Sequence, residues 1–129
     1  MNNEEQYKNS LLKNDKNMSK PGISQFFKQV YGLVEMAIED CELILEVGSG
    51  AGASDRYLVS REIVRTDLLR FPDRKIVGDV DVHNLPYEKN SYDAVIAVDT
   101  FHHFQNPYKA FSEILRVLKP GGRLVVVEP

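Results

Sequence analysis

Three glycines follow a short apolar run at a spacing that forms a ligand pocket in many α/β proteins. The run Leu43–Leu45 is typical of a buried strand, and Gly48, Gly50 and Gly52 come directly after it. Glycine accepts a positive φ and leaves open the space of a Cβ, so such a turn can approach a ligand closely. The turn alone leaves the ligand undecided, because Gly48-x-Gly50-x-x-Ala53 also satisfies a dinucleotide fingerprint.

Two carboxylates are placed to contact such a ligand. Asp67 ends a second predicted strand, at the offset of about 20 residues from the glycine turn where an acidic side chain accepts hydrogen bonds from ribose hydroxyls. Capping a turn is the alternative role for Asp67. Glu46 lies at the end of the first strand, where it either fixes the backbone of the turn or contacts a cationic group of the ligand.

The histidines and the cysteine allow less chemistry. His102 and His103 follow an apolar strand, and we interpret them first as loop structure and second as a general base with a near-neutral pKa. Metal binding is disfavoured, because paired ligands on a helix lie three or four residues apart and no Cys or carboxylate cluster joins them. Cys41, the single cysteine, is interpreted as a buried structural thiol.

Composition limits the class of protein and its partners. The 129 residues are 43% hydrophobic and 27% charged, as in one globular domain. A net charge of −3 gives no general attraction to nucleic acid. No apolar run approaches the ~18 residues of a membrane helix, and the polar N-terminus has no signal-peptide core. We therefore expect a cytoplasmic protein without nucleic-acid or membrane partners.

The apolar pattern places the candidate residues on alternating strands and helices. Residues 1–20 form a polar arm that is either disordered or weakly helical, and residues 21–129 form the domain. Helices are predicted from about Ser24 to Ile38, from Ala53 to about Val59, and from Pro107. Strands are predicted at 43–47, 63–67, 76–77, 94–98 and 124–127. This alternation implies a parallel sheet with right-handed crossovers.

One crossover is too short for a helix. Only Leu68 to Lys75 join the second and third strands, and Pro72 interrupts them, whereas parallel crossovers usually need a dozen or more residues. We expect an extended or single-turn link that covers this flank of the sheet thinly.

Later segments complete the pattern of a known family. Asp81-Val82-His83-Asn84-Leu85-Pro86, Ser91–Val95 and Leu118-Lys119-Pro120-Gly121-Gly122 follow the glycine turn in order. With them, residues 43–129 closely resemble the class I, Rossmann-like S-adenosylmethionine-dependent methyltransferases that act on small molecules. The resemblance implies a three-layer α/β sandwich with a mostly parallel five-stranded sheet in the order 3-2-1-4-5.

The resemblance also implies a role for each motif residue. The glycines would line the methionine and ribose portions of S-adenosylmethionine, Asp67 would hold the ribose hydroxyls, and Asp81 would accept a hydrogen bond from the adenine amino group. The cofactor-binding residues would be Glu46, Gly48, Gly50, Gly52, Asp67, Asp81, Val82 and Asp99. Methyl transfer depends mainly on in-line placement, so no triad is expected, and His102, His103 and Asp99 are only weak catalytic candidates. No metal is expected.

The C-terminal end departs from the family pattern. The chain ends at Glu128-Pro129, where relatives continue through a helix and an antiparallel strand pair. We expect a homodimer, formed through the bare edge at Leu124–Val127 or by exchange of the N-terminal segment, unless the chain is a fragment. The predicted function is methyl transfer to an unidentified small molecule. The alternatives are a non-catalytic S-adenosylmethionine or S-adenosylhomocysteine binding module and, last, a nicotinamide-dependent oxidoreductase.

Overall fold

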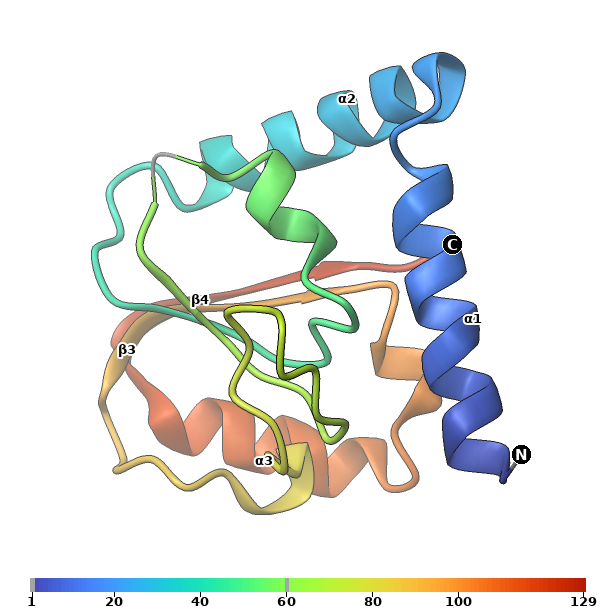
Figure 1. Cartoon of the computed structure of the whole chain (residues 1–129). Helices are drawn as coiled ribbons and strands as arrows, with labels where there is room; N and C mark the ends of the chain where they lie inside the picture. Colours follow the sequence, from blue (N-terminus) through green and yellow to red (C-terminus); the bar gives the residue numbers. More distant parts are fainter. Residues whose placement is uncertain (1, 60) are drawn as a thin grey trace.

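A computed structural model describes residues 2–59 and 61–129 as a three-layer α/β sandwich (Figure 1). The helices α2 and α3 lie on opposite faces of one sheet. The elements in chain order are α1 (Asn3–Asn17), α2 (Pro21–Ala37), β1 (Ile44–Glu46), η1 (Ala53–Arg56), β2 (Ile63–Arg65), η2 (Val82–Asn84), β3 (Tyr92–Val98), η3 (Phe101–His103), α3 (Pro107–Val117) and β4 (Leu118–Val127), where η denotes a 3-10 helix. The predicted α/β sandwich is confirmed.

The sheet is parallel and has the strand order β2-β1-β3-β4. The prediction of five strands was wrong in one respect, because Ile76-Val77 contributes only a single parallel bridge, between Val77 and Thr66. The chain bends at once after this bridge, since Asp79 has a φ of +57°. The bridge lies beside β2. Without the segment at 76–77, the predicted order 2-1-4-5 corresponds to the observed order β2-β1-β3-β4, so the order of the strands that form is as predicted.

Each face of the sheet buries one helix. Tyr31, Val34 and Ile38 of α2 pack on one face against Ile44 and Ile96. On the other face, Ala110, Ile114 and Val117 of α3 pack against core residues that include Leu45 and Val95. Strand residues alternate between the two faces, and this arrangement buries β1 completely.

The polar N-terminal segment forms α1, a helix of 15 residues. Asn2 caps it by accepting a hydrogen bond from the Glu5 N–H at 2.7 Å, and Glu4 and Glu5 favour its positive N-terminus. Leu11 and Leu12 pack near a small core cluster of Ala51, Leu69 and Phe71. A helix with few apolar residues is therefore held in place by a short tertiary contact.

The helix predicted at 53–59 is shorter in the structure. Only Ala53–Arg56 form a 3-10 turn, because Leu58 then enters the core on the α2 side. Arg61 turns the chain back toward β2 by donating to the backbone oxygens of Cys41 and Glu39, at 2.9 and 2.6 Å. No helix in the described ranges has the length and apolar composition needed to cross a bilayer.

Candidate active site at the carboxyl ends of the strands

A cavity of about 600 Å³ lies at the carboxyl ends of β1 and β3, lined also by residues of α1 and α2. Parallel strands direct their carboxyl ends to one edge of the sheet, and α/β proteins bind ligands there. The predicted site residues that line this cavity are Glu46, Gly48, Gly50, Asp67, Asp99 and His103. The structure does not place Gly52, Asp81, Val82 or His102 in this lining.

The glycine turn has the backbone that its sequence predicted. Gly48, Gly50 and Gly52 all have positive φ, at +62°, +56° and +83°. At Gly48 the chain is also crowded, because a Cβ would lie 2.0 Å from Oγ1 of Thr100. Only glycine fits where the turn meets the loop after β3.

Asp67 holds the glycine turn against the end of β2. One carboxylate oxygen accepts a hydrogen bond from the Gly50 N–H at 2.8 Å, and the other accepts from the Leu69 N–H at 2.9 Å. Burial raises the pKa of Asp67, against the lowering effect of these hydrogen bonds. The turn-capping role left open by the sequence is therefore observed. Each carboxylate oxygen has a further lone pair, so contact with ribose hydroxyls stays a compatible prediction.

Glu46 is buried below the turn, in a polar network that links β1, β2 and η1. Its carboxylate accepts a hydrogen bond from the Ser54 hydroxyl at 2.5 Å and lies 3.7 Å from Nε of Arg65. Burial raises its pKa to about 7, although Ser54 and Arg65 act in the opposite direction. Glu46 thus reaches the cavity lining as a group that can gain or lose a proton near neutral pH.

The loop after β3 carries the other candidates. Asp99 is strained at a φ of +52°, and its N–H donates to the backbone oxygen of Val127 at 2.7 Å. His103 lies edge-on to Tyr7 of α1, with ring centroids 6.0 Å apart. His102 points instead to Glu128, with 2.5 Å between Nδ1 and Oε2.

Glu128 is a site-adjacent residue that sequence reasoning missed. Its second oxygen accepts from the Phe101 N–H at 2.6 Å, so it ties η3 to the end of β4. Ligand atoms of Asp99, His102 and Glu128 lie within 4.8 Å of one another, close enough to hold a metal ion, but all three residues are exposed. This cluster carries no independent sign of a ligand.

Asp81 and Val82 belong to a neighbouring segment. Asp81 caps η2 by accepting from the His83 N–H at 2.9 Å, and this bond, with the His83 ring, lowers the pKa of Asp81. Val82 is buried on the α3 side of the sheet. The Val80 N–H donates to the backbone oxygen of Asp67 at 3.0 Å, so the segment runs beside the site. Asp79 pairs with Arg70 at the surface.

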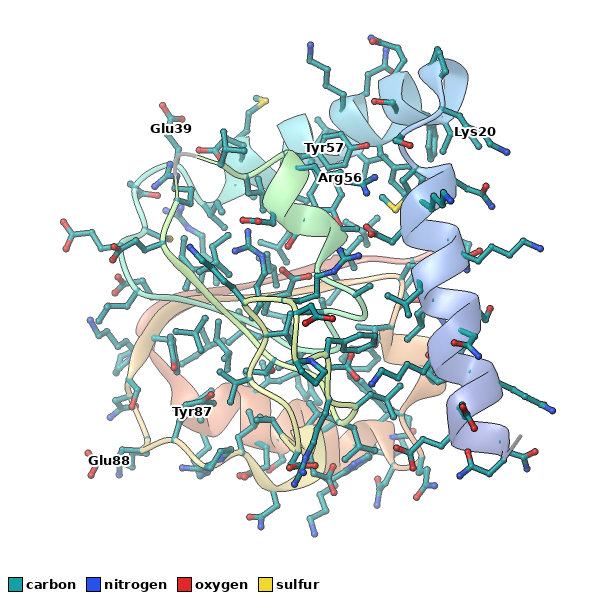
Figure 2. The ribbon with its side chains drawn as sticks, viewed as in Figure 1. Lys20, Glu39, Arg56, Tyr57, Tyr87 and Glu88 are labelled. Atoms are coloured by element: carbon teal, nitrogen blue, oxygen red, sulfur yellow. The ribbon has the colours of Figure 1, made fainter. Side chains whose placement is uncertain are left out.

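α1 contributes residues that the sequence did not single out. Asp15 is only 5% exposed, and one oxygen pairs with Arg74 at 2.9 Å and Arg56 at 3.3 Å. Arg56, at the end of η1, donates to the backbone oxygen of Asp15 at 2.7 Å, and Tyr57, the next residue, lies beside it (Figure 2). The other carboxylate oxygen of Asp15 has no hydrogen-bond partner within the described part of the chain. The helical spacing of Leu11, Leu12 and Asp15 was the only sequence signal for this contact.

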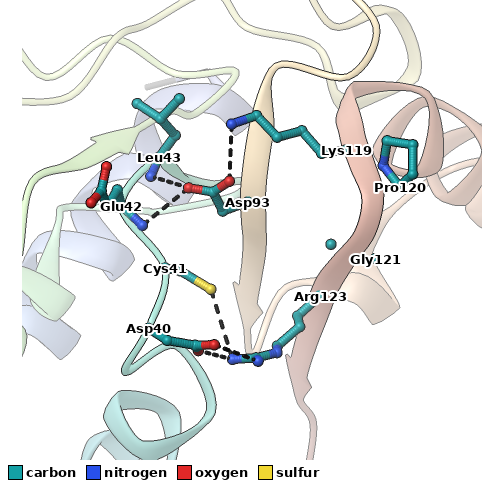
Figure 3. A pocket seen from close by; sticks show the side chains of 10 residues that line it. Asp40, Cys41, Glu42, Leu43, Asp93, Lys119, Pro120, Gly121 and Arg123 are labelled. Carbon is teal, nitrogen blue, oxygen red and sulfur yellow. Dashed lines mark hydrogen bonds and ion pairs between the residues drawn. The ribbon is translucent and has the colours of Figure 1, made fainter.

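A second hollow, of about 400 Å³, lies near the amino ends of β1, β3 and β4 (Figure 3). Four of its charged groups form two pairs: Arg123 bonds Asp40, and Lys119 lies 3.0 Å from Asp93. Cys41 lies beside Arg123, and burial raises the pKa of its thiol. The prediction of a buried thiol is confirmed. These contacts join β4 to β3 and to the segment before β1.

Together these features define a Rossmann-like α/β protein with a nucleotide-type site at the carboxyl ends of its strands. The chain belongs to the class I S-adenosylmethionine-dependent methyltransferases, because residues 45–126 match the family described as "Methyltransferase domain".

Named relatives agree with this assignment. A demethylmenaquinone methyltransferase of Clavibacter sepedonicus is 34% identical over 100 residues, which cover 67% of this chain and 41% of the relative. The chain thus spans about two fifths of this relative's length, and less than a fifth of some other curated relatives that it matches.

Two solved structures show how far the fold extends. A structure described as a putative S-adenosyl-L-methionine-dependent methyltransferase, from Methanococcus maripaludis, has a TM-score of 0.74 at 24% identity. That match covers 92% of this chain and 62% of the other. The cyclase SpnF has a TM-score of 0.64 at 29% identity, with 77% of this chain and 44% of SpnF covered.

Proposed function

We propose that the chain binds S-adenosylmethionine in the cavity beneath α1 and transfers its methyl group to a small-molecule acceptor. The observation that carries the proposal is the contact between the glycine turn and Asp67, where the Gly50 N–H donates to the carboxylate at 2.8 Å. This contact places a close-approach backbone and an acceptor for hydroxyl groups side by side.

The chemistry of the cavity suits this cofactor. The charged side chains in its lining are carboxylates, those of Asp15, Glu46, Asp67 and Asp99, and the lining described includes no Lys or Arg. A cationic sulfonium is favoured in such surroundings. S-adenosylmethionine, when bound, supplies an already activated methyl group.

The chain's own residues would then bind and orient. We assign the methionine and ribose portions to the glycines at 48, 50 and 52 and the ribose hydroxyls to Asp67. Asp81 and Val82 are assigned to adenine, because their segment runs beside Asp67. Asp99 is assigned to the sulfonium end. Holding the acceptor in line with the methyl group can supply much of the rate enhancement. His103, in the lining, and His102, held by Glu128, stay candidates for accepting a proton from the acceptor.

The acceptor is taken to be a small molecule. Several relatives are named demethylmenaquinone methyltransferases, and their name supports an acceptor of that size. The chain covers only about two fifths of each of these relatives, so its acceptor is not inferred from their name.

A second candidate is a binding module without methyl transfer. The favouring observation is the fold shared with SpnF, a protein described as a cyclase and not as a methyltransferase. One fold can carry different reactions.

Calorimetry tests the cofactor site. We expect S-adenosylmethionine and S-adenosylhomocysteine to bind and NAD not to bind. Asp67→Ala should weaken binding by about 1–3 kcal/mol, because the carboxylate's hydrogen-bond partners lose their acceptor. Asp73→Ala is the control, since Asp73 is exposed and outside the cavity lining. Binding of NAD without S-adenosylmethionine would overturn the proposal.

A second measurement separates enzyme from binder. Release of S-adenosylhomocysteine is followed against a panel of metabolites, and methyl transfer predicts release with at least one of them. Tight cofactor binding with no release from any panel member would favour the binding module.

A further inference from the structure

Part of the cavity lining is not used by the cofactor assignment. Five of the lining side chains are apolar or aromatic and come from outside the glycine turn, and we call them the apolar wall: Met18, Ile23, Phe27, Tyr31 and Val98. Ile23, Phe27 and Tyr31 repeat every four residues on α2, and this spacing places them on one face of the helix.

The apolar wall is backed by packed structure. Met18, Phe27 and Val98 pack against the core cluster on the α2 side of the sheet, and Tyr31 belongs to that cluster. The Tyr31 ring stacks on Tyr57, with centroids 5.0 Å apart and planes only 4° from parallel. These contacts hold the wall in position, so the site is largely pre-formed, as small-molecule sites usually are.

Charge limits what can lie against this wall. Among the charged groups of the cavity lining, two carboxylates have cationic partners: Glu46 lies beside Arg65, and Asp15 pairs with Arg74 and Arg56. Asp67 is held by backbone N–H groups, and Asp99 is exposed at the rim. An anionic molecule would meet carboxylates and an apolar surface, with no Lys or Arg in the lining. Both features disfavour the binding of an anionic molecule in this cavity.

We infer that the methyl acceptor is an uncharged, largely apolar molecule, such as one with an aromatic ring system, which lies against the apolar wall. An anionic acceptor is expected to bind more weakly, because no Lys or Arg of the cavity lining would face its charge. This inference rests on the proposed function, because it assigns the remaining part of the cavity lining to the acceptor.

Two probes of the same ring size test the inference. At pH 7, 2-naphthol is uncharged and 2-naphthoate carries a carboxylate. Each is titrated into the full chain, with and without saturating S-adenosylhomocysteine, and binding is followed through the methionine methyl signals in NMR. Met18 reports on the apolar wall. Met36 on α2 is the internal control, because it is 71% exposed and lies outside the cavity lining.

We expect 2-naphthol to shift the Met18 signal and leave Met36 unchanged, and 2-naphthoate to bind at least about tenfold more weakly. Phe27→Ala should weaken 2-naphthol binding by about tenfold, because an aromatic contact surface is lost. Leu33→Ala, a truncation on the exposed side of α2, should leave it unchanged. Both variants should bind S-adenosylhomocysteine with unchanged affinity.

Equal binding of the two probes would overturn the inference, as would an equal effect of Phe27→Ala and Leu33→Ala. The cofactor arm keeps the two proposals apart. If S-adenosylhomocysteine fails to bind, methyl transfer is contradicted. The probe contrast without cofactor then still decides the chemistry of the apolar wall.

Discussion

Gly48 and Gly121 both have a left-handed backbone, but their surroundings differ. A Cβ at Gly48 would meet Thr100, whereas a Cβ at Gly121 would meet nothing within 4 Å. Gly121→Ala should therefore cost only the backbone strain, about 1–2 kcal/mol. Gly48→Ala should cost about 1–3 kcal/mol more, because the loop after β3 must move. Urea unfolding followed by circular dichroism measures both, and equal losses would show that the Thr100 contact is not limiting.

Glu46 makes stability depend on pH near neutrality. Its folded-state pKa is raised to about 7 by burial, so the folded state binds a proton that the unfolded state has already lost. The stabilisation is complete below the ordinary pKa of glutamate and is lost as pH rises through 7. We expect the free energy of unfolding to fall by on the order of 3 kcal/mol between pH 4.5 and 8 from this group.

Glu46→Gln isolates that contribution. The amide oxygen can still accept from Ser54 but carries no charge, so the pH dependence should flatten in this window. The raised pKa of Asp67 acts with the same sign in both proteins. Unfolding curves from pH 4.5 to 8 with the same slope for variant and wild type would contradict the assignment.

At the scale of elements, a buried carboxylate of α1 adds to the apolar contacts that hold this helix to the domain. Asp15 pairs with Arg74 and Arg56, which are 40% and 37% exposed, so solvent screens part of the interaction. Asp15→Ala should weaken the docking of α1 by about 1–2 kcal/mol. Hydrogen exchange of residues 3–17 should then accelerate while the strands stay protected.

The control for α1 is another acidic residue. Asp79→Asn removes one charge of the surface pair between Asp79 and Arg70, whose side chains are 59% and 75% exposed. Asparagine also accepts the positive φ at this position, so α1 exchange should stay unchanged. Equal exchange in both variants would mean that Leu11 and Leu12 suffice to hold the helix.

At the scale of the molecule, β4 has a free edge beside an apolar helix flank. β4 pairs only with β3 in the described sheet, and Val126 is 42% exposed. On α3, Glu113 and Arg116 face the segment after η2, through hydrogen bonds to Leu85. Helical geometry therefore puts Phe111 and Leu115 on the opposite flank, toward β4.

We expect two copies to pair through β4 about a two-fold axis, which would bring both α3 flanks together. Val126→Lys should convert the dimer to a monomer, because it places a charge on the pairing edge. Val59→Lys adds the same charge at an exposed loop position and is the control. Light scattering decides, and a monomeric wild type at high concentration would contradict pairing. Exchange of α1, the alternative, would respond to Asp15→Ala instead.

Sequence by itself determined the parts whose cause is local. A positive φ at Gly48, Gly50 and Gly52 and the packing faces of α2 and α3 follow from residue type and spacing. The second strand was predicted to end at Asp67, but β2 ends at Arg65, and Thr66 adds only the bridge to Val77. The strand predicted at 76–77 and the helix predicted at 53–59 are both shorter in the structure. The secondary-structure propensity of single residues does not indicate where the chain must bend.

Tertiary structure alone decided how the site is closed. Asp15, Tyr7 and the apolar wall come from segments far apart in sequence, and they meet because α1 docks across the carboxyl ends of the strands. The residues of α1 are too polar for a hydrophobic pattern to place the helix. Its position depends on contacts with Arg74 and Arg56, which exist only once the turn and the loop after β2 have folded together.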